Sequence, residues 1–157
     1  MLSDFQQALA EITASPRFCQ AVRRDASLLQ ERYQLSERER RQVLAMAQHP
    51  AMECACSLYR ANRLAPLFRN LPGTLEALRD RLESTLNAYW EAHPWPYRYG
   101  YLESERFCHW LAPFATAGNA PAELAQTWQA ERLALRGRVS HFLADSGIPF
   151  PPDLQRC

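Results

Sequence analysis

Residues 36–46 read SERERRQVLAM and contain the clearest helix signal in the chain. The Ser36 hydroxyl can accept a hydrogen bond from the backbone of Glu39, and the Glu39 carboxylate can accept one from the backbone of Ser36, which makes a capping box. Apolar residues, beginning with Val43, then follow at helical spacing. Pro50 cannot continue the helix because it lacks a backbone donor. The pattern therefore predicts a helix that begins after Ser36 and ends near Pro50.

The chain before this helix shows further helix starts of the same kind. Ser15 precedes Pro16, and a hydroxyl cap followed by proline at the first helical position is typical of a helix N-terminus. Ser3 and Asp25 can cap two more short helices. The apolar residues of these segments recur at helical spacing, and they are Phe5, Leu9, Ile12, Phe18, Val22, Leu28, Leu29 and Tyr33. We expect a succession of short helices up to Pro50.

The C-terminal half of the chain predicts longer helices. Thr74 follows a proline–glycine turn and can cap one long amphipathic helix. The apolar face of that helix is formed by Leu75, Leu78, Leu82, Leu86 and Tyr89. Aromatic residues such as Phe107 mark another helix, and a last helix starts near Pro121.

Proline residues interrupt this helical pattern at two places. Pro66 is expected to kink or break the helix in which it lies, and residues 147–152 should lie extended on the surface. The sequence thus predicts a mainly α fold, a helical bundle in a single domain over residues 1–157. Its helical N-terminal half covers about residues 3–70, and its helical C-terminal half covers about residues 74–146 before an extended tail.

Residues 93–101 read HPWPYRYGY and do not follow a helical pattern. Tyr97, Tyr99 and Tyr101 alternate as the residues of a short strand do, so the sequence predicts a small β annex near residues 95–102. An exposed strand edge would suit an added peptide strand, because backbone pairing gives affinity and alternate side-chain pockets give specificity. Aromatic packing in a turn between helices is the competing interpretation.

Composition narrows the classes of function. The 157 residues carry a net charge of +1 and are 47% hydrophobic, which argues against a disordered chain and against a dedicated nucleic-acid binder. The N-terminus lacks a basic stretch followed by an apolar run, and no segment has the roughly 20 apolar residues that a membrane span needs. We therefore expect a cytoplasmic protein without nucleic-acid or membrane partners. Its lysines and arginines are all arginines. Arginine suits the carboxylates and aromatic rings of protein partners, but codon bias in a GC-rich genome is the favoured explanation of this composition.

The cysteines are five in number and irregularly spaced, at Cys19, Cys54, Cys56, Cys108 and Cys157. Free thiols are expected in a reducing cytosol. Cys54 and Cys56, with His49 nearby, are candidate metal ligands. Residues two apart on a helix point about 200° away from each other, however, and zinc sites usually need a second cysteine pair, so core packing is the competing interpretation for Cys56. Cys108 precedes His109, but adjacent helical residues do not face each other as a nucleophile and its base must.

Residues 57–67 read SLYRANRLAPL and place Arg60, Asn62 and Arg63 among apolar neighbours. Arg63 shares a helical face with Tyr59, so its guanidinium needs a partner when that face is covered. The partner can be a local glutamate in a structural salt bridge or a carboxylate of a bound protein. Both interpretations are compatible with the sequence.

Several segments resemble one known family. Residues 32–39 (RYQLSERE) and 58–67 (LYRANRLAPL), followed by residues 105–111 (ERFCHWL) and the helix around residues 130–132, are similar to the MbnC-like partner proteins of methanobactin biosynthesis. The likeness spans roughly residues 25–135, and the 58–67 run is its distinctive part.

This resemblance implies a non-catalytic subunit. Proteins of the family form a heterodimer with a multinuclear non-haem iron oxidase and help to bind the leader of a ribosomally synthesised precursor peptide. The oxidase converts peptide cysteines to oxazolone and thioamide groups. The iron would belong to the oxidase, and this chain would contain neither a cofactor nor a catalytic residue. The expected partner- and peptide-binding residues are Arg60, Asn62, Arg63, Tyr97, Tyr99 and Tyr101. The family usually has strands late in the chain, whereas this chain departs from a helical pattern only near Tyr97.

A second hypothesis comes from a different class of protein. Cys54, Cys56 and Cys108, with His49, would make the chain a small cytoplasmic metal-binding or thiol redox protein. Tight stoichiometric metal that is lost on Cys54→Ser would favour this hypothesis over the partner-protein hypothesis.

Overall fold

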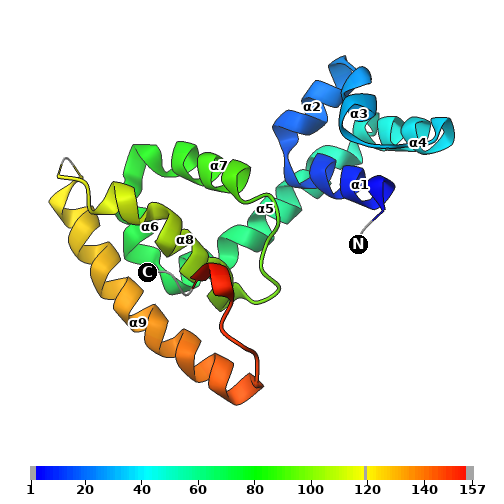
Figure 1. Cartoon of the computed structure of the whole chain (residues 1–157). Coiled ribbons are helices and arrows are strands. Elements are labelled where there is room, and N and C mark those ends of the chain that lie inside the picture. The colour runs from blue at the N-terminus through cyan, green and yellow to red at the C-terminus, as the bar shows by residue number, and fades with distance from the viewer. Residues whose placement is uncertain (1–2, 119, 155–157) are drawn as a thin grey trace. The chain divides into compact units, whose positions relative to one another are not determined.

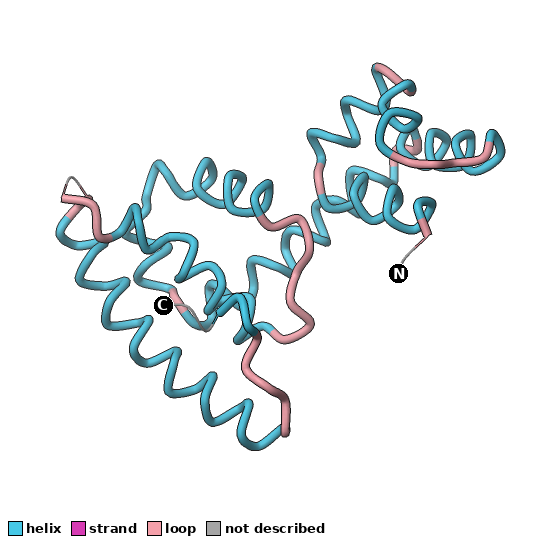
Figure 2. The backbone as a smooth tube through the Cα atoms, in the orientation of Figure 1, coloured by secondary structure: helices cyan, strands magenta, loops and turns pink. Residues whose placement is uncertain are grey.

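The computed structural model describes residues 3–118 and 120–154, and the regular structure in this part of the chain is helical. Figure 2 shows helices joined by loops, with no strand among the described residues. The prediction of a mainly α fold is confirmed. The predicted β annex near residues 95–102 is wrong, because residues 93–99 form a loop and the helix Gly100–Ala115 begins directly after it. No described helix is both long and apolar enough to cross a membrane.

The chain folds into two compact units, Met1–Asn62 and Arg63–Cys157. The border between them lies within α5 (Ala51–Asn70), so the first part of this helix belongs to one unit and its last part to the other. Each unit has a hydrophobic core of its own. The four tryptophans all belong to the second unit, and they are Trp90, Trp95, Trp110 and Trp128.

The first unit is built from short capped helices. In chain order it contains α1 (Asp4–Ala14), α2 (Pro16–Arg24), α3 (Ser27–Arg32), α4 (Glu37–Gln48) and the beginning of α5 (Figure 1). The predicted capping box is present, since Ser36 Oγ accepts from the Glu39 amide at 3.3 Å and Glu39 Oε2 accepts from the Ser36 amide at 2.8 Å. Ser15 caps α2, and Asp25 accepts from the Ser27 amide at 2.9 Å where α3 starts. The starts of α2 and α4 follow the sequence prediction, whereas the N-cap position of α3 is Ala26, one residue after the predicted Asp25.

The core of the first unit lies where α1, α2 and α4 pack on one another. Its buried side chains are Ala8, Ile12, Cys19, Val22, Leu29, Tyr33, Val43, Ala47, Met52 and Cys56. Two of the three cysteines described in this unit, Cys19 and Cys56, are therefore core residues that act as small apolar side chains.

The second unit contains the longer helices. It comprises the end of α5, α6 (Pro72–Leu78), the 3₁₀ turn η1 (Arg79–Arg81), α7 (Leu82–Ala92), α8 (Gly100–Ala115), α9 (Ala122–Ser146) and the 3₁₀ turn η2 (Pro152–Leu154). In Figure 1, α9 packs against both α6 and α8. None of residues 147–152, which the sequence predicts to lie on the surface, is buried, and Leu154 just after them lies in the core of this unit.

A close approach between α5 and α8 depends on one glycine. A Cβ atom on Gly100 would lie 2.8 Å from Pro66 Cβ, closer than carbon atoms of neighbouring residues pack. Asn70 Nδ2 donates to the Pro66 carbonyl at 2.9 Å and to Ser104 Oγ at 3.0 Å, which ties the two helices together beside this contact. Although Pro66 is expected to interrupt its helix, α5 continues through it to Asn70.

The long amphipathic helix predicted from Thr74 is divided into α6 and α7. Arg79 has a φ of 46°, a left-handed value that cannot continue an α-helix and is uncommon for a residue with a side chain. Leu78 and Leu86 lie on either side of this break, and both still reach the core. The apolar pattern therefore predicts which residues are buried but not where the backbone turns.

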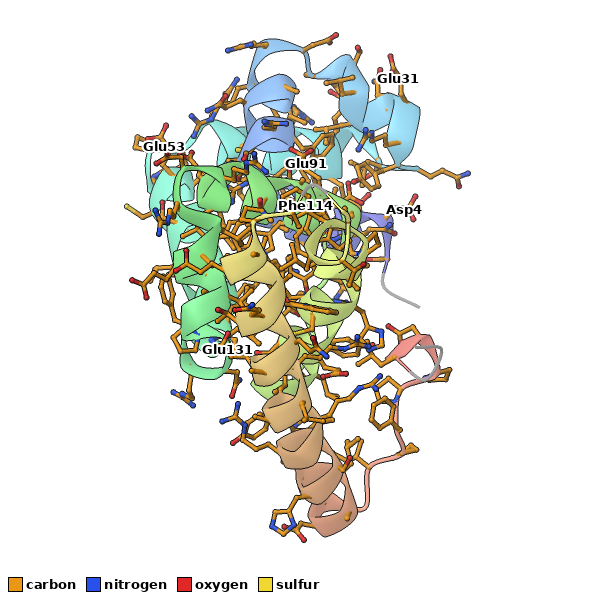
Figure 3. The ribbon with its side chains drawn as sticks, turned by 90° about the vertical axis from the view of Figure 1, so that its left-hand side faces the viewer. Asp4, Glu31, Glu53, Glu91, Phe114 and Glu131 are labelled. Carbon is orange, nitrogen blue, oxygen red and sulfur yellow. The ribbon has the colours of Figure 1, made fainter. Side chains whose placement is uncertain are left out.

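A carboxylate from α9 caps the start of α6. Glu131, labelled in Figure 3, accepts hydrogen bonds at Oε1 from the Gly73 amide at 2.9 Å and at Oε2 from the Thr74 amide at 2.8 Å. The Thr74 hydroxyl also donates to Oε2 at 2.7 Å. Because the residue that precedes α6, Leu71, has no side-chain acceptor, Glu131 replaces a local cap and binds α9 to α6.

Candidate functional site

The most polar part of the second unit's interior is centred on Glu103 in the first turn of α8. Arg63 from α5 donates to Glu103 Oε1 through Nη2 at 2.7 Å and through Nε at 3.0 Å. Arg106, one helical turn further along α8, donates to Glu103 Oε2 at 2.6 Å. Arg63 and Glu103 are only 4% and 2% exposed. These three side chains, named the Glu103 centre below, form a buried ionic cluster.

The Glu103 carboxylate also accepts hydrogen bonds from α7 and from the loop that follows it. Tyr89 Oη on α7 donates to Glu103 Oε1 at 3.1 Å, and the backbone amide of Tyr97 donates to Oε2 at 2.9 Å. Each carboxylate oxygen therefore accepts from a guanidinium and from a neutral donor. The Glu103 centre joins α5, α7, α8 and the 93–99 loop through one side chain.

The two arginines of the centre also hold the loop backbone. Arg106 Nη2 donates to the Trp95 carbonyl at 2.7 Å, and Arg63 Nη1 donates to the Pro94 carbonyl at 3.4 Å. The Arg106 guanidinium lies 4.4 Å from the centre of the Tyr97 ring, in a cation–π contact. The loop has no regular backbone pairing, and these contacts give it a fixed conformation.

The electrostatics of the Glu103 centre are those of a structural cluster. Two guanidinium groups compensate one buried carboxylate, which makes its burial tolerable. Burial, followed by the negative charge of Glu103, raises the pKa of Tyr89 and keeps its hydroxyl protonated as a donor. An external ligand would have to displace donors that already join four segments. The arrangement can hold the unit together, and it presents no free reactive group.

The structure decides between the two interpretations of Arg63. Its guanidinium is bound within the second unit to Glu103, forty residues further along the chain, and not to a local glutamate. The structural salt bridge is thus present, with a partner that the sequence did not identify. The interface role expected for Arg63 has no support, because the side chain is buried and bonded.

The three alternating tyrosines pack inside the second unit. Tyr97 Oη donates to the Asp153 carboxylate. The rings of Tyr99 and Tyr101 lie 5.2 and 5.6 Å from the ring of Phe142 on α9. Aromatic packing between helices, the competing interpretation, is what the structure shows, and the predicted strand edge is not formed by these residues.

Other predicted contact residues lie on the part of α5 that belongs to the first unit. Asn62 is exposed and Arg60 is half-buried. Leu58, one helical turn before Asn62, is 64% exposed, and Ala61 beside it is exposed as well. Leu58, Ala61 and Asn62, named the Leu58 face below, form the exposed side of the distinctive 58–67 run within this unit.

A second buried carboxylate on α8 was not predicted from the sequence. Glu105 is fully buried, and its Oε1 lies 3.1 Å from His109 Nε2 and accepts from Arg136 Nε at 3.2 Å. The four-residue spacing between Glu105 and His109 was the available signal, because such pairs meet on one helical face.

Cys108 lies in the core, and burial raises its pKa, so this thiol is protonated and does not form a nucleophile–base pair with His109.

The predicted metal ligands are not brought together. Cys54 is exposed, whereas Cys56 is a core residue, as the core interpretation predicts. Cys56 and Cys108 belong to the cores of different units, and His49 Nδ1 accepts from the Ala51 amide at 3.1 Å. Within residues 3–118 and 120–154, no group of three or more His, Cys, Asp or Glu side chains is placed to hold a metal ion. Cys157 lies outside the described residues.

Comparison with family models, curated proteins and solved structures finds no match to this chain.

Proposed function

We propose that this chain is the non-catalytic subunit of a heterodimer with a multinuclear non-haem iron oxidase and that it helps to bind the leader of a ribosomally synthesised precursor peptide. The proposal starts from the resemblance in residues 58–67 to the MbnC-like partner proteins. The observation that carries it is the division of this run into a buried side, which includes Arg63 and Leu67, and the exposed Leu58 face. The buried side stabilises the fold, and the exposed side is left for a partner.

The Leu58 face has the chemistry of a protein interface. The centres of such interfaces are apolar and depleted of charge, and a leucine and an alanine supply that surface here. The Asn62 amide adds both hydrogen-bond donors and an acceptor at its edge. Arg60, which is half-buried and points to another side of α5, keeps its predicted role as a contact residue in the proposal.

The loop of residues 93–99 is the part of the second unit that we assign to the leader peptide. Trp95 in this loop is 38% exposed, while the Glu103 centre fixes the backbone on which it stands. A fixed loop loses little conformational entropy on binding, and tryptophan is enriched among residues that dominate binding energy. Trp95 replaces the strand edge as the proposed leader contact. In this proposal the iron and the oxidative chemistry belong to the oxidase.

Co-purification tests the proposal. The tagged chain is co-expressed with the iron oxidase encoded beside it, and the captured material is analysed by mass spectrometry and for iron. In the wild type we expect an equimolar, iron-containing complex. Leu58→Glu should weaken the complex at least about tenfold, because a charge would be buried without a partner at the interface.

Met46→Glu is the matched control for this variant. Met46 is also a large exposed apolar residue of the first unit, 44% exposed on α4, but it lies outside the resembling run. Its substitution should leave the complex unchanged. Equal weakening by both variants would contradict the assignment of the Leu58 face, and a wild-type chain that captures no oxidase would contradict the function itself.

A further inference from the structure

Three sulfur-containing side chains line one pocket in the first unit. The pocket has a volume of about 180 Å³ and lies between α2 and α5. Cys19 from α2, with Met52 and Cys56 from α5, contribute to its wall, and all three side chains are buried. The sequence pattern pairs Cys56 with Cys54, whereas the fold places it with Cys19, thirty-seven residues away in the sequence.

The two thiols are oriented by backbone acceptors on other helices. Cys19 Sγ donates to the Ala47 carbonyl at 3.7 Å, and Cys56 Sγ donates to the Ile12 carbonyl at 3.4 Å. Their sulfur atoms are thus fixed in one pocket by contacts that hold each side chain in place.

A guanidinium group lies in the same pocket wall. Arg23 Nε donates to the Ala47 carbonyl at 2.5 Å, the same oxygen that accepts from Cys19. Arg23 Nη1 donates to Glu53 Oε1 at 3.0 Å, and Glu53 is labelled in Figure 3. Burial raises the pKa of both thiols, while the charge of Arg23 acts in the opposite direction. In the free protein both thiols are protonated, and a ligand must displace their protons.

We propose that Cys19, Cys56 and Met52 form a binding site for one soft monovalent cation of the Cu(I) class. Thiolate and thioether sulfur are the ligands that select Cu(I). A structural zinc site uses four Cys, His or carboxylate ligands, and the residues lining this pocket supply fewer than four. On binding, two S–H bonds break, two protons leave to solvent and two metal–thiolate bonds form, with no change in oxidation state. The bound unit then carries one negative charge, and the Arg23 guanidinium, which lines the same pocket, can compensate it. This inference is independent of the proposed function.

Anaerobic titration of the reduced full-length chain with Cu(I), in competition with a chromogenic Cu(I) chelator, tests the site. We expect one equivalent of tightly bound metal per chain. Cys19→Ser and Cys56→Ser should each weaken the competed affinity by more than about 100-fold, because losing a ligand costs more than losing an outer-shell partner. Met52→Leu keeps the volume of the side chain and should weaken binding less.

Cys54→Ser is the matched control. Cys54 is on the same helix as Cys56, two positions away, but it is exposed and does not line the pocket. Its substitution should leave the affinity unchanged. Alkylation of the wild-type protein, followed over time by mass spectrometry, adds a test that needs no variant to fold. Because Cys19 and Cys56 are buried, they should react slowly in the free protein, and one equivalent of Cu(I) should slow their alkylation further while exposed Cys54 reacts at an unchanged rate. The proposal is overturned if Cu(I) is not bound stoichiometrically, if Cys54→Ser loses the metal, or if the protected cysteines are others.

Discussion

Arg63 and Glu103 lie forty residues apart in the sequence and form a buried ion pair with 2.7 Å between Nη2 and Oε1. The pair joins the end of α5 to the start of α8 inside the second unit. Both residues fall within or beside residues 58–67 and 105–111, the segments from which the proposed resemblance was drawn. These two charged side chains therefore stabilise the second unit internally. Our proposal assigns partner recognition to the neighbouring exposed residues of the Leu58 face.

Removing the carboxylate of this pair should destabilise the protein more than removing one guanidinium. Glu103→Gln leaves Arg63 and Arg106 without their shared counter-charge, and we expect a loss of about 3–5 kcal/mol in the free energy of unfolding. Arg63→Met should cost less, because Arg106 still compensates Glu103. Urea unfolding measures both effects. As a control, Glu123→Gln removes the exposed ion pair with Arg79 and should cost less than about 1 kcal/mol. The opposite order for Glu103→Gln and Arg63→Met would show that the centre does not depend on the carboxylate.

Gly100→Ala should strain the contact between α5 and α8. The added Cβ would meet Pro66 Cβ at 2.8 Å, and the two helices must move apart, at an expected cost of about 1–3 kcal/mol. Gly137→Ala is the matched control, because Gly137 lies within α9 and a Cβ atom added there would meet nothing within 4 Å. There alanine should stabilise the helix by about 0.5–1 kcal/mol. Thermal unfolding of the two variants should therefore shift in opposite directions, and a shared direction would contradict the close approach.

Glu131→Gln should weaken the start of α6. The amide group of glutamine presents a donor where the Gly73 and Thr74 amides also donate, so one of these groups loses its acceptor. We expect a loss of about 1–2 kcal/mol, similar to the loss of an N-cap residue. Gln129→Ala, an exposed position on the same helix, should change the free energy of unfolding by less than about 0.5 kcal/mol. If Glu131→Gln were as mild as this control in urea unfolding, the cap would contribute nothing.

Stability should fall on mild acidification, and His93 should account for part of this loss. Burial, and then the positive charge of Arg106, lowers the pKa of His93 below its usual value of 6.5. The unfolded chain consequently takes up a proton at higher pH than the folded chain does, so this contribution to stability is complete above about pH 7.5 and is lost as the pH falls through 6.5 and below. His93→Gln should show a smaller decrease in urea midpoint between about pH 7.5 and pH 5.5 than the wild type. Parallel pH profiles for the two proteins would contradict this role.

Local helix signals could be predicted from the sequence because their causes are local. The Ser36–Glu39 capping box and the Ser15 cap need only residues within one helical turn, and both are present. The apolar spacing likewise identified Val22, Leu29 and Val43 as apolar-face residues, and all three are fully buried.

Features that depend on distant residues could not be predicted in the same way. The left-handed backbone conformation occurs at Arg79 and not at a glycine, so the sequence contains no signal for this break. One amphipathic pattern therefore covers two helices. The alternation from Tyr97 to Tyr101 resembles a strand, but Tyr101 already belongs to α8. Helical spacing shows that Arg63 needs a counter-charge, yet only the packing of α5 against α8 supplies Glu103. Cys19 was missed as a partner of Cys56 for the same reason.

The distribution of tryptophan gives the second unit a spectroscopic signature that the first unit lacks. Since Trp90, Trp95, Trp110 and Trp128 all belong to the second unit, intrinsic tryptophan fluorescence during denaturation reports on that unit alone. Far-ultraviolet circular dichroism reports on the helices of both units. Superimposable transitions from the two probes would mean that melting is one cooperative event across α5, and a dichroism change that precedes or follows the fluorescence change would mean that the first unit melts separately.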